Sequence, residues 1–378
     1  MKILMFGKAY FPHLGGVETV LRQLAVRMSA LGHEVVVLCF GERDMEEMLE
    51  GVRVVRIRPL LSVGSAPLGW RCYREYRRLS AWADMVHFHT PNPMGEIACL
   101  LAPPHPRTIV TYHGDAFRPR TLLPYYDVVM RLFLRRCRTL CTTSSNLVRS
   151  SRVLSRLGRS ISVIPIGVDP GRFSFPTEES LRVAESFVEG LGDFTVLFAG
   201  RLVYYKGVET LLEALASLEH GEGPSVGALI VGSGPLEPDL KCLTEAHGIS
   251  DRVRRIPPQP DGVYSALFRR TDCFVLPSLY PVEAFGIAML EAMAAGLPVV
   301  STELGTGTSW VNANGVTGLV VPPGDVEALA DAIRCLRDDS GRRRRMGDAA
   351  RRRVEELFGE ERMIARYVAE MEKMYNSS

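Results

Sequence analysis

The chain has 378 residues, of which 46% are hydrophobic, so it is long enough for about two domains with separate cores. Its formal net charge of +2 is too small to indicate nucleic acid as a main partner. The 8 cysteines form no C-x-x-C pair and stand mostly among apolar residues, which is typical of reduced thiols in the cytoplasm. No signal peptide is recognisable, and no apolar run approaches the roughly 18 residues of a membrane span. We therefore expect a cytoplasmic protein, soluble or peripheral on a membrane.

The first half of the chain alternates between predicted strands and helices. It begins with a strand at 3–6, a loop at 7–16 and an amphipathic helix at 17–31. Further strands are predicted at 35–40, 52–57, 85–89, 108–112, 139–142 and 162–166. This alternation indicates a doubly wound parallel sheet, in which ligands bind beyond the carboxyl ends of the strands.

Two features of this half are candidates for such a site. Gly15 and Gly16 open the first helix, where backbone N–H groups and the helix dipole can receive a phosphate or sugar oxygen. A simple turn is the alternative. His113 follows the strand at 108–112 and is therefore well placed to contact a ligand. The alternative is a hydrogen-bonded structural histidine, and this alternative is favoured more strongly for His87 and His89.

The pattern breaks at 167–177, which we predict to be a linker, and a second α/β series follows. Its strands are predicted at 195–199, 228–231, 253–256, 273–276, 299–300 and 318–321. A helix at 326–336 and one or two more within 355–375 complete the chain. The arginines at 342–345 and 351–353 are interpreted as solvated helix faces.

The loop from Gly200 to Gly207 contains two cations, Arg201 and Lys206, between a strand end and a helix start. A positive charge opposes the helix dipole at this position. The arrangement is favourable if an anion lies between the two side chains, and Arg with Lys suits a diphosphate. Two solvated loop charges are the alternative.

The stretch from Glu283 to Val300 is almost entirely apolar after its first residue, and Glu291 is its only other ionisable residue. Glu291 lies in a helix predicted at 287–295 that ends at Gly296. A buried carboxylate requires a partner. The nearby sequence offers no basic residue, so we predict that a ligand supplies the hydrogen-bond donors. We expect the two glutamates to line one crevice near the helix N-terminus.

In their order and spacing these motifs resemble the retaining glycosyltransferases of family 4, which have the GT-B fold. The motifs are Gly15-Gly16-Val17-Glu18, Gly200-Arg201 with Lys206-Gly207, Val231-Gly232-Ser233-Gly234-Pro235, Glu283 with Glu291, and Asn314-Gly315 with Thr317-Gly318 before Pro322-Pro323-Gly324-Asp325. The resemblance covers nearly the whole chain. It implies two Rossmann-like domains that face each other across a cleft. Residues 1–170, with a returning C-terminal helix at 360–378, would bind the acceptor, and residues 171–359 would bind the nucleotide sugar.

The resemblance also implies roles for individual residues. The implied catalytic residues are Arg201, Lys206, His113 and Glu283, and the implied donor-binding residues are Gly15, Gly16, Gly232, Gly234, Phe285, Gly286, Ile287 and Glu291. The two cations would bind the donor diphosphate and stabilise its developing charge. Glu291 would bind the ribose hydroxyls and Glu283 the sugar hydroxyls, while His113 would approach the transferred sugar. The leaving diphosphate would help to deprotonate the acceptor, so that no protein nucleophile, metal or other cofactor is implied.

The implied substrate is a GDP- or UDP-sugar, from which a hexose passes to a hydroxyl of a glycan or lipid-linked acceptor in cell-surface polysaccharide or glycolipid synthesis. The amino-acid sequence at 305–312, which includes Trp310, resembles that of the rhamnosyl/mannosyltransferase subset and favours a mannose-type donor. A sugar-nucleotide epimerase on the same fold and a non-catalytic sugar-nucleotide-binding protein are the alternatives. The absence of G-x-G-x-x-G from the sequence disfavours a dehydrogenase.

Two predicted helices carry arginines beside aromatic or apolar residues. They contain Arg71, Arg74 and Arg78 beside Trp70, Tyr73 and Tyr76, and Arg131, Arg135, Arg136 and Arg138 around Leu132, Phe133 and Leu134. Basic helices with apolar side chains can rest on anionic lipid. We therefore predict peripheral binding to the inner face of the cell membrane, with ordinary solvated arginines as the alternative.

Overall fold

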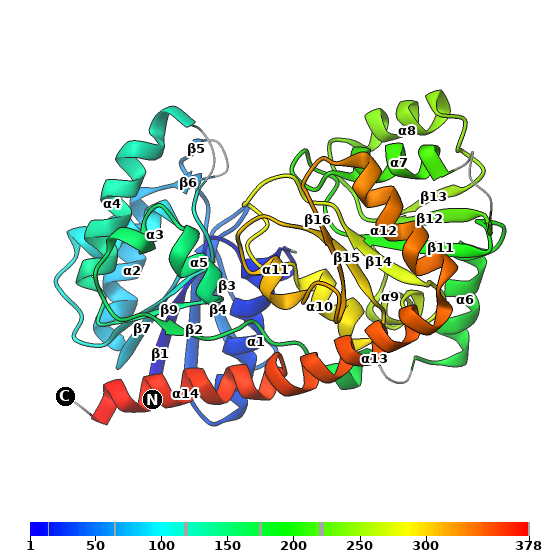
Figure 1. The fold of residues 1–378 in the computed structure, drawn as a ribbon. Helices are drawn as coiled ribbons and strands as arrows, with labels where there is room; N and C mark the ends of the chain where they lie inside the picture. The colour runs from blue at the N-terminus through cyan, green and yellow to red at the C-terminus, as the bar shows by residue number, and fades with distance from the viewer. Residues whose placement is uncertain (14, 64–65, 117–119, 174–175, 219–222, 377–378) are drawn as a thin grey trace. The chain divides into compact units, whose positions relative to one another are not determined.

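The structure is a computed structural model that describes residues 1–13, 15–63, 66–116, 120–173, 176–218 and 223–376. The chain forms two compact units, Met1–Ile166 with Met363–Ser378, and Gly167–Arg362 (Figure 1). Both units are α/β, each with a largely parallel sheet, so the predicted fold class of two doubly wound domains is confirmed. The unit boundaries lie a few residues from the predicted ones. Residues 174 and 175 of the predicted linker lie outside the described residues.

The first unit contains an eight-stranded sheet in the order β10-β9-β8-β7-β1-β2-β4-β3, with a separate hairpin. The sheet strands are β1 (Lys2–Phe6), β2 (Glu34–Phe40), β3 (Met45–Leu49), β4 (Val52–Ile57), β7 (Met85–Thr90), β8 (Thr108–Tyr112), β9 (Thr139–Thr142) and β10 (Ser162–Val163), and the hairpin is β5 (Leu61–Val63) with β6 (Ala66–Leu68). The helices are α1 (Gly16–Ala30), α2 (Trp70–Trp82), α3 (Pro93–Leu101), α4 (Leu123–Arg136), α5 (Ser145–Ser150) and α14 (Glu360–Asn376).

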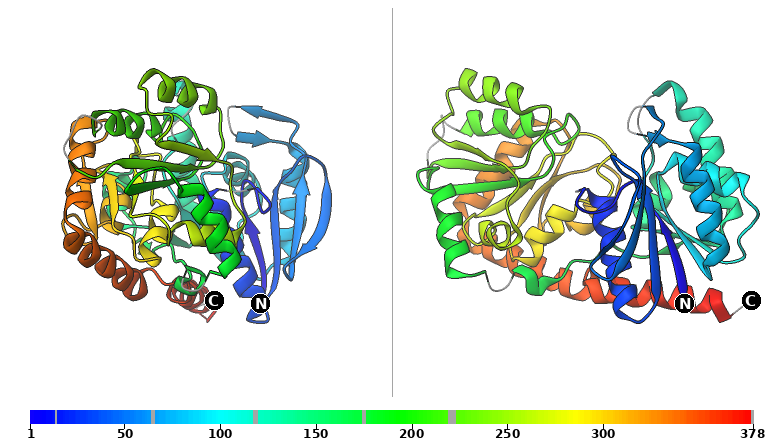
Figure 2. Two further views of the ribbon diagram at one scale, coloured as in Figure 1. Left: turned by 90° about the vertical axis from the view of Figure 1, so that its right-hand side faces the viewer. Right: turned by 180° about the vertical axis from the view of Figure 1, so that it is seen from behind.

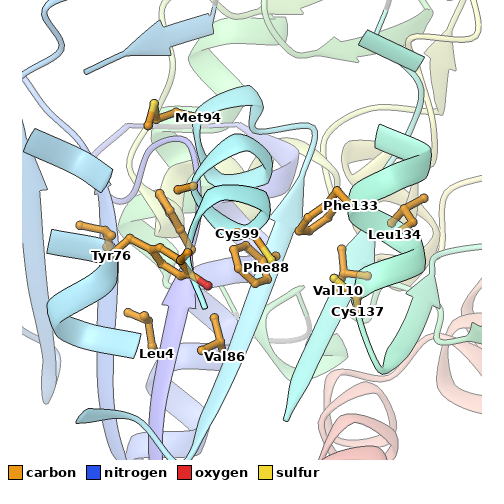
Figure 3. Close-up of a cluster of buried hydrophobic side chains, with 14 of the residues drawn as sticks. Leu4, Tyr76, Val86, Phe88, Met94, Cys99, Val110, Phe133, Leu134 and Cys137 are labelled. Carbon is orange, nitrogen blue, oxygen red and sulfur yellow. The ribbon is translucent and has the colours of Figure 1, made fainter. Parts of the chain in front are cut away.

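An apolar core holds α2, α3 and α4 on one face of this sheet (Figure 3). Phe88 of β7 packs edge-on against Phe133 of α4, with ring centroids 5.1 Å apart. Tyr76 of α2 adds a second aromatic contact to Phe88 at 5.8 Å. These large buried rings order the helices over the sheet, since each buries a large apolar area. The carboxyl ends of β7 and β8 are thereby held in fixed positions.

The C-terminal helix α14 returns to the first unit and crosses β8 to β10 (Figures 1 and 2). Its Tyr367 hydroxyl lies 2.9 Å from Thr111 Oγ1 of β8. Its Glu370 accepts a 2.6 Å hydrogen bond from Ser162 of β10. Buried methionines on the same helix face complete the packing.

The strand β3 is absent from the predicted strands, and the predicted strand at 162–166 is reduced to two residues, β10. The β3 sequence Met-Glu-Glu-Met-Leu consists of good helix formers. It pairs antiparallel with β4, and cross-strand ion pairs at 2.6 Å join Glu46 to Arg53 and Glu47 to Arg56. Tertiary pairing therefore overrides local propensity here.

The second unit contains a six-stranded sheet, parallel throughout, in the order β13-β12-β11-β14-β15-β16. Its strands are β11 (Phe194–Ala199), β12 (Val226–Val231), β13 (Val253–Ile256), β14 (Cys273–Leu276), β15 (Val299–Thr302) and β16 (Gly318–Val321). Its helices are α6 (Glu178–Val188), α7 (Val208–Ser217), α8 (Glu237–Ala246), α9 (Asp261–Leu267), α10 (Ile287–Ala294), α11 (Thr308–Val311), α12 (Val326–Asp338) and α13 (Ser340–Leu357).

The strand order of the second unit reverses between β11 and β14. The chain runs outward from β11 to β13, crosses back, and runs outward again from β14 to β16. Such a reversal opens a crevice at the carboxyl ends of the two central strands. The loops at 200–207 and 277–286 follow those strands, so the topology brings together two motifs that are far apart in the sequence.

Candidate active site

Lys206 and Glu283 meet at this reversal point. The Lys206 ammonium lies 2.5 Å from Glu283 Oε2, and the side chains are only 13% and 11% exposed. Ser278 donates a second hydrogen bond to the same oxygen at 3.2 Å. Among the described residues Glu283 Oε1 has no hydrogen-bond partner. The carboxylate therefore anchors the cation through one oxygen and retains the other for a hydroxyl donor.

Arg201 differs from Lys206 in its surroundings. It is exposed and forms no ion pair with any residue that the structure describes. The sequence predicts an anion held between the two cations. In the structure Lys206 already has a protein carboxylate as its partner, whereas the Arg201 guanidinium is available to a ligand.

Gly207 explains how the loop carrying both cations enters α7. Its φ is +65°, and an added Cβ would lie 2.1 Å from the carbonyl oxygen of Pro277. A glycine is required for both reasons. The close contact joins the loop after β11 to the loop after β14, so Gly207 brings Lys206 within reach of Glu283.

Glu291 has protein partners, so the expectation that this buried carboxylate lacks one was wrong, while its contact with a ligand stays a prediction. Tyr264 of α9 donates a 2.8 Å hydrogen bond to Glu291 Oε2, and the Arg172 guanidinium lies 3.7 Å from Oε1. Arg172 also pairs with Asp261 at 2.5 Å. Burial raises the pKa of Glu291, while Tyr264 and Arg172 lower it. No contact in the structure joins Glu291 to Glu283, so the crevice shared by both carboxylates stays a prediction.

The helix α10 begins with amide groups that have no internal partner. Within the described part of the chain, no acceptor bonds the backbone N–H of Phe285, Gly286 or Ile287. Gly286 has a φ of +80°. The Phe285 ring is buried edge-on against Trp310 and Phe358, at 6.3 and 6.0 Å, and this packing orients the turn. Free N–H groups at a helix start form a site for an anion.

Gly232 and Gly234 pack the loop after β12 against the loop after β11. An added Cβ at Gly232 would lie 1.9 Å from the Gly200 carbonyl oxygen, and one at Gly234 would lie 2.3 Å from that of Leu202. The Gly234 N–H is bonded by the Glu237 carboxylate at 2.7 Å. The structure thus gives both glycines a packing role, and their contact with a donor stays a prediction.

In the first unit, Gly15 and Gly16 lie where the sequence predicts, before α1 and at its first position. The Gly15 carbonyl accepts from both the amide and the hydroxyl of Thr19, at 2.9 Å each. A Cβ added at Gly15 would lie 2.2 Å from a carboxylate oxygen of Glu18. The absence of a side chain therefore leaves room for a carboxylate or another group with oxygen atoms at the start of α1.

His113 belongs to a buried cluster with His87 and His89. His89 Nδ1 lies 3.1 Å from His113 Nε2, and His87 Nε2 lies 2.8 Å from Thr111 Oγ1. Burial lowers the pKa of His87 and of His113 to about 3, and lowers that of His89 well below its usual value. Asp115, two residues after His113, accepts a 2.6 Å hydrogen bond from Ser151 Oγ, which stabilises the start of the loop that follows β8. All three histidines are thus hydrogen-bonded, as the alternative interpretation expected.

The arginine-rich helices differ in part from the prediction. The aromatic and apolar residues expected beside the arginines are mostly buried, namely Tyr73, Tyr76, Phe133 and Leu134. Arg136 donates to the carbonyl oxygen of Leu100 at 2.9 Å. Arg353, predicted to be solvated, donates to the carbonyl oxygen of Trp310 at 2.7 Å.

An apolar stripe does face outward on α4. Tyr125, Val128 and Leu132 are 73%, 48% and 51% exposed, and they lie three and four residues apart on one helix face. Arg135 is exposed one turn farther along this face. None of the helices in the described part of the chain combines the length and the hydropathy that crossing a bilayer would require.

Two further observations concern the chemistry available to the chain. The eight cysteines are free thiols, and six of them are buried, as expected. Over the residues that the structure describes, no three His, Cys, Asp or Glu side chains are grouped so that they could hold a metal ion.

Comparison with known proteins identifies the family. Residues 183–353 match the model for group 1 glycosyl transferases, and residues 14–172 match that for glycosyltransferase family 4. The chain is 33% identical to the O-antigen chain mannosyltransferase C of Escherichia coli, over 97% of each chain. It is 34% identical to the D-rhamnosyltransferase WbpZ of Pseudomonas aeruginosa, over 95% of this chain and 92% of the relative. The chain belongs to the group 1 glycosyltransferases.

Solved structures confirm the fold of this glycosyltransferase. The sucrose-phosphate synthase of Thermosynechococcus elongatus superimposes with a TM-score of 0.80 at 20% identity, over 100% of both chains. HepE of Anabaena in complex with UDP-glucose gives 0.77 at 19% identity, over 99% of this chain and 100% of the other. The likeness at these identities shows a shared GT-B fold.

Three site residues of the glycosyltransferase were missed by sequence reasoning. Arg172 and Tyr264 contact Glu291, and Ser278 contacts Glu283. Arg172 lies in the predicted linker and Tyr264 in a helix without a motif, so neither had a local signal. Ser278, five residues before Glu283, could have been found as a hydroxyl in the same loop.

Proposed function

We propose that this glycosyltransferase moves a mannose-type hexose from a GDP- or UDP-sugar to a hydroxyl of a glycan or lipid-linked acceptor, with retention of configuration and without a metal ion. The product would belong to a cell-surface polysaccharide or glycolipid. The names of the two relatives support the sugar and the pathway: one is an O-antigen chain mannosyltransferase and the other a D-rhamnosyltransferase. The second unit would bind the donor and the first unit the acceptor.

The observation that carries this proposal is the Lys206–Glu283 pair in the crevice between β11 and β14. A diphosphate would bind Lys206 and Arg201, and the free N–H groups at the start of α10 would add donors. Glu283 Oε1 would accept from hydroxyls of the sugar. Glu291, oriented by Tyr264, would accept from the ribose.

The proposed reaction needs no covalent enzyme intermediate. The bond between the anomeric carbon and the diphosphate oxygen breaks, and the acceptor oxygen bonds to the same face of the sugar. The acceptor proton passes to the departing diphosphate. The two cations stabilise the charge that grows on the diphosphate, and this lowers the barrier to the oxocarbenium-like transition state.

Donor binding can be tested by the shift in melting temperature with GDP-mannose, UDP-glucose and an ADP-sugar, because a ligand at 100 times its Kd stabilises the folded state by about 2.7 kcal/mol. We expect GDP-mannose to give the largest shift. Transfer is then tested with a lipid-linked glycan, and the anomeric configuration of the product is read by NMR. Lys206→Ala or Arg201→Ala should abolish transfer, whereas Glu291→Ala should mainly weaken donor binding. Normal turnover in either cation variant would overturn the assignment.

The same assay separates the alternatives. Incubation of the donor without acceptor should leave the sugar unchanged, whereas an epimerised donor would favour the epimerase. Donor binding without turnover on any acceptor would favour a sugar-nucleotide-binding protein.

We also propose that the exposed stripe on α4 rests on an anionic membrane that carries the acceptor. The stripe combines Tyr125, Val128 and Leu132 with the exposed Arg135. Flotation with vesicles containing anionic lipid at low salt should carry the wild type, and Leu132→Asp should float less. Leu31→Asp is a matched control, because Leu31, which follows α1, is exposed to a similar extent, 58% against 51% for Leu132. Equal flotation of both variants would contradict this surface.

A further inference from the structure

The cluster of His87, His89 and His113 has six ring nitrogens, and their partners can be accounted for one by one. Two hydrogen bonds join His89 Nδ1 to His113 Nε2 and His87 Nε2 to Thr111 Oγ1. His87 Nδ1 and His89 Nε2 are buried and have no partner among the described residues. The sixth nitrogen, His113 Nδ1, forms no hydrogen bond with them either, but it is not enclosed by the protein. It is therefore the only ring nitrogen in this cluster that can meet a ligand.

The hydrogen bond between His89 and His113 contains one proton, and its position decides what His113 presents. Because both rings are buried and their pKa values are lowered, each is neutral and has one N–H and one lone pair. If His113 Nε2 donates, the proton of His89 must be on Nε2, which is a buried N–H without an acceptor. If His89 Nδ1 donates, His89 Nε2 is a buried lone pair without a donor.

The second arrangement is the favourable one, because orphaned buried N–H groups are rarer than unsatisfied acceptors. We propose that His89 is a positioning residue that donates from Nδ1 to His113 Nε2 and so holds His113 as the Nδ1–H tautomer. His113 then presents an N–H donor at the carboxyl end of β8. Its backbone is held as well, since the His113 amide donates to the Thr90 carbonyl at 3.0 Å.

This inference rests on the proposed function for its consequence in catalysis. A neutral Nδ1–H can donate a hydrogen bond to a sugar hydroxyl or to a diphosphate oxygen. It cannot remove a proton from the acceptor, because that nitrogen has no lone pair available. His113 would therefore orient the sugar or stabilise charge, and the leaving diphosphate would be the base.

The experiment compares His89→Phe, which keeps the ring size and removes the donor, with His89→Asn, whose amide N–H can take the place of Nδ1–H. His87→Phe is the control, because His87 is equally buried on the same strand but does not bond His113. The first readout is the tautomer of His113, from long-range proton–nitrogen NMR of protein labelled in its histidines. The second is kcat and KM for the donor.

We expect wild type and His89→Asn to hold His113 protonated at Nδ1. In His89→Phe the Nδ1–H tautomer loses the hydrogen bond that favours it, so the Nε2–H tautomer should become detectable beside it. Loss of the held ring and tautomer should lower kcat about 10-fold to 100-fold, with KM for the donor changed less than about 2-fold. His87→Phe should lower the melting temperature as much as His89→Phe does and leave both the tautomer and kcat unchanged. A wild-type His113 protonated at Nε2 would overturn the proposal, and so would a kcat for His89→Asn as low as that for His89→Phe. The NMR readout needs no substrate, so failure of the glycosyltransferase assay would count against the proposed function alone.

Discussion

Breaking the ion pair of Lys206 and Glu283 should lower the free energy of unfolding, and this effect can be measured separately from activity. Removal of one partner leaves the other charge in a site that is almost closed to water, since the side chains are 13% and 11% exposed. Removing one partner from a fully buried pair costs about 3–5 kcal/mol, and this pair retains slight exposure. We therefore expect Lys206→Met and Glu283→Gln each to lower the free energy of unfolding by about 2.5 kcal/mol.

The double variant removes both charges and should cost only about 2 kcal/mol, so that the coupling energy is about 3 kcal/mol. Thermal or urea unfolding at neutral pH measures this cycle, and each single variant should melt about 5–10 °C below the wild type. Transfer activity should be lost in all three variants, so the double variant regains stability without regaining activity.

The exposed pair of Lys241 and Glu245, at 3.9 Å, provides the control. Its coupling energy should stay below about 0.5 kcal/mol. A coupling energy below about 0.5 kcal/mol for Lys206 and Glu283 as well would mean that these two side chains are not paired in solution. That result would refute the ion pair as the feature that organises the crevice.

Three further predictions concern the architecture around the site. Gly207→Ala should lower the free energy of unfolding by at least about 2 kcal/mol, because φ is positive and the new Cβ would lie 2.1 Å from a carbonyl oxygen. Gly296→Ala is the control: φ is +86° but the space around it is open, so it should cost about 1 kcal/mol in the same unfolding assay. Tyr264→Phe should raise KM for the donor about 5-fold to 10-fold with little change in kcat, because Glu291 loses a hydrogen bond that orients it, and an unchanged KM would contradict this. The pKa of His87 is lowered by burial to about 3, so the unfolded state binds an extra proton as the pH falls below the usual value of 6.5 and stability is lost. Between pH 7.5 and 5.5 the wild type should therefore lose about 1.4 kcal/mol more unfolding free energy than His87→Phe, and equal losses would show that this ring is not buried in a neutral form.

The local pattern of the chain was enough to predict most of the two sheets. Buried parallel strands are short apolar runs, and β8, β9, β13, β14 and β16 begin and end at the predicted residues. β14 is recognisable because its burial on both faces leaves no polar position within it, whereas β13, at the edge of the sheet, contains two half-buried arginines. β3 was missed because its side chains favour a helix, and only pairing with β4 makes it a strand.

The candidate site was predicted as a set of residues, without its pairings. The spacing of the glutamates and the loop of Arg201 to Gly207 are local motifs, which the amino-acid sequence alone contains. That Lys206 is bound by Glu283, 77 residues away, follows from the reversal of strand order between β11 and β14.

The amino-acid sequence by itself determined the α/β class, the two-domain organisation and the motifs of a glycosyltransferase. Only the tertiary structure decided which groups meet: Arg172 with Glu291, and His89 with His113. The physical reason is that an ion pair or hydrogen bond between distant segments leaves no periodicity in the chain, whereas burial of a strand or a helix face does. The chemistry of each candidate residue is set by such long-range partners.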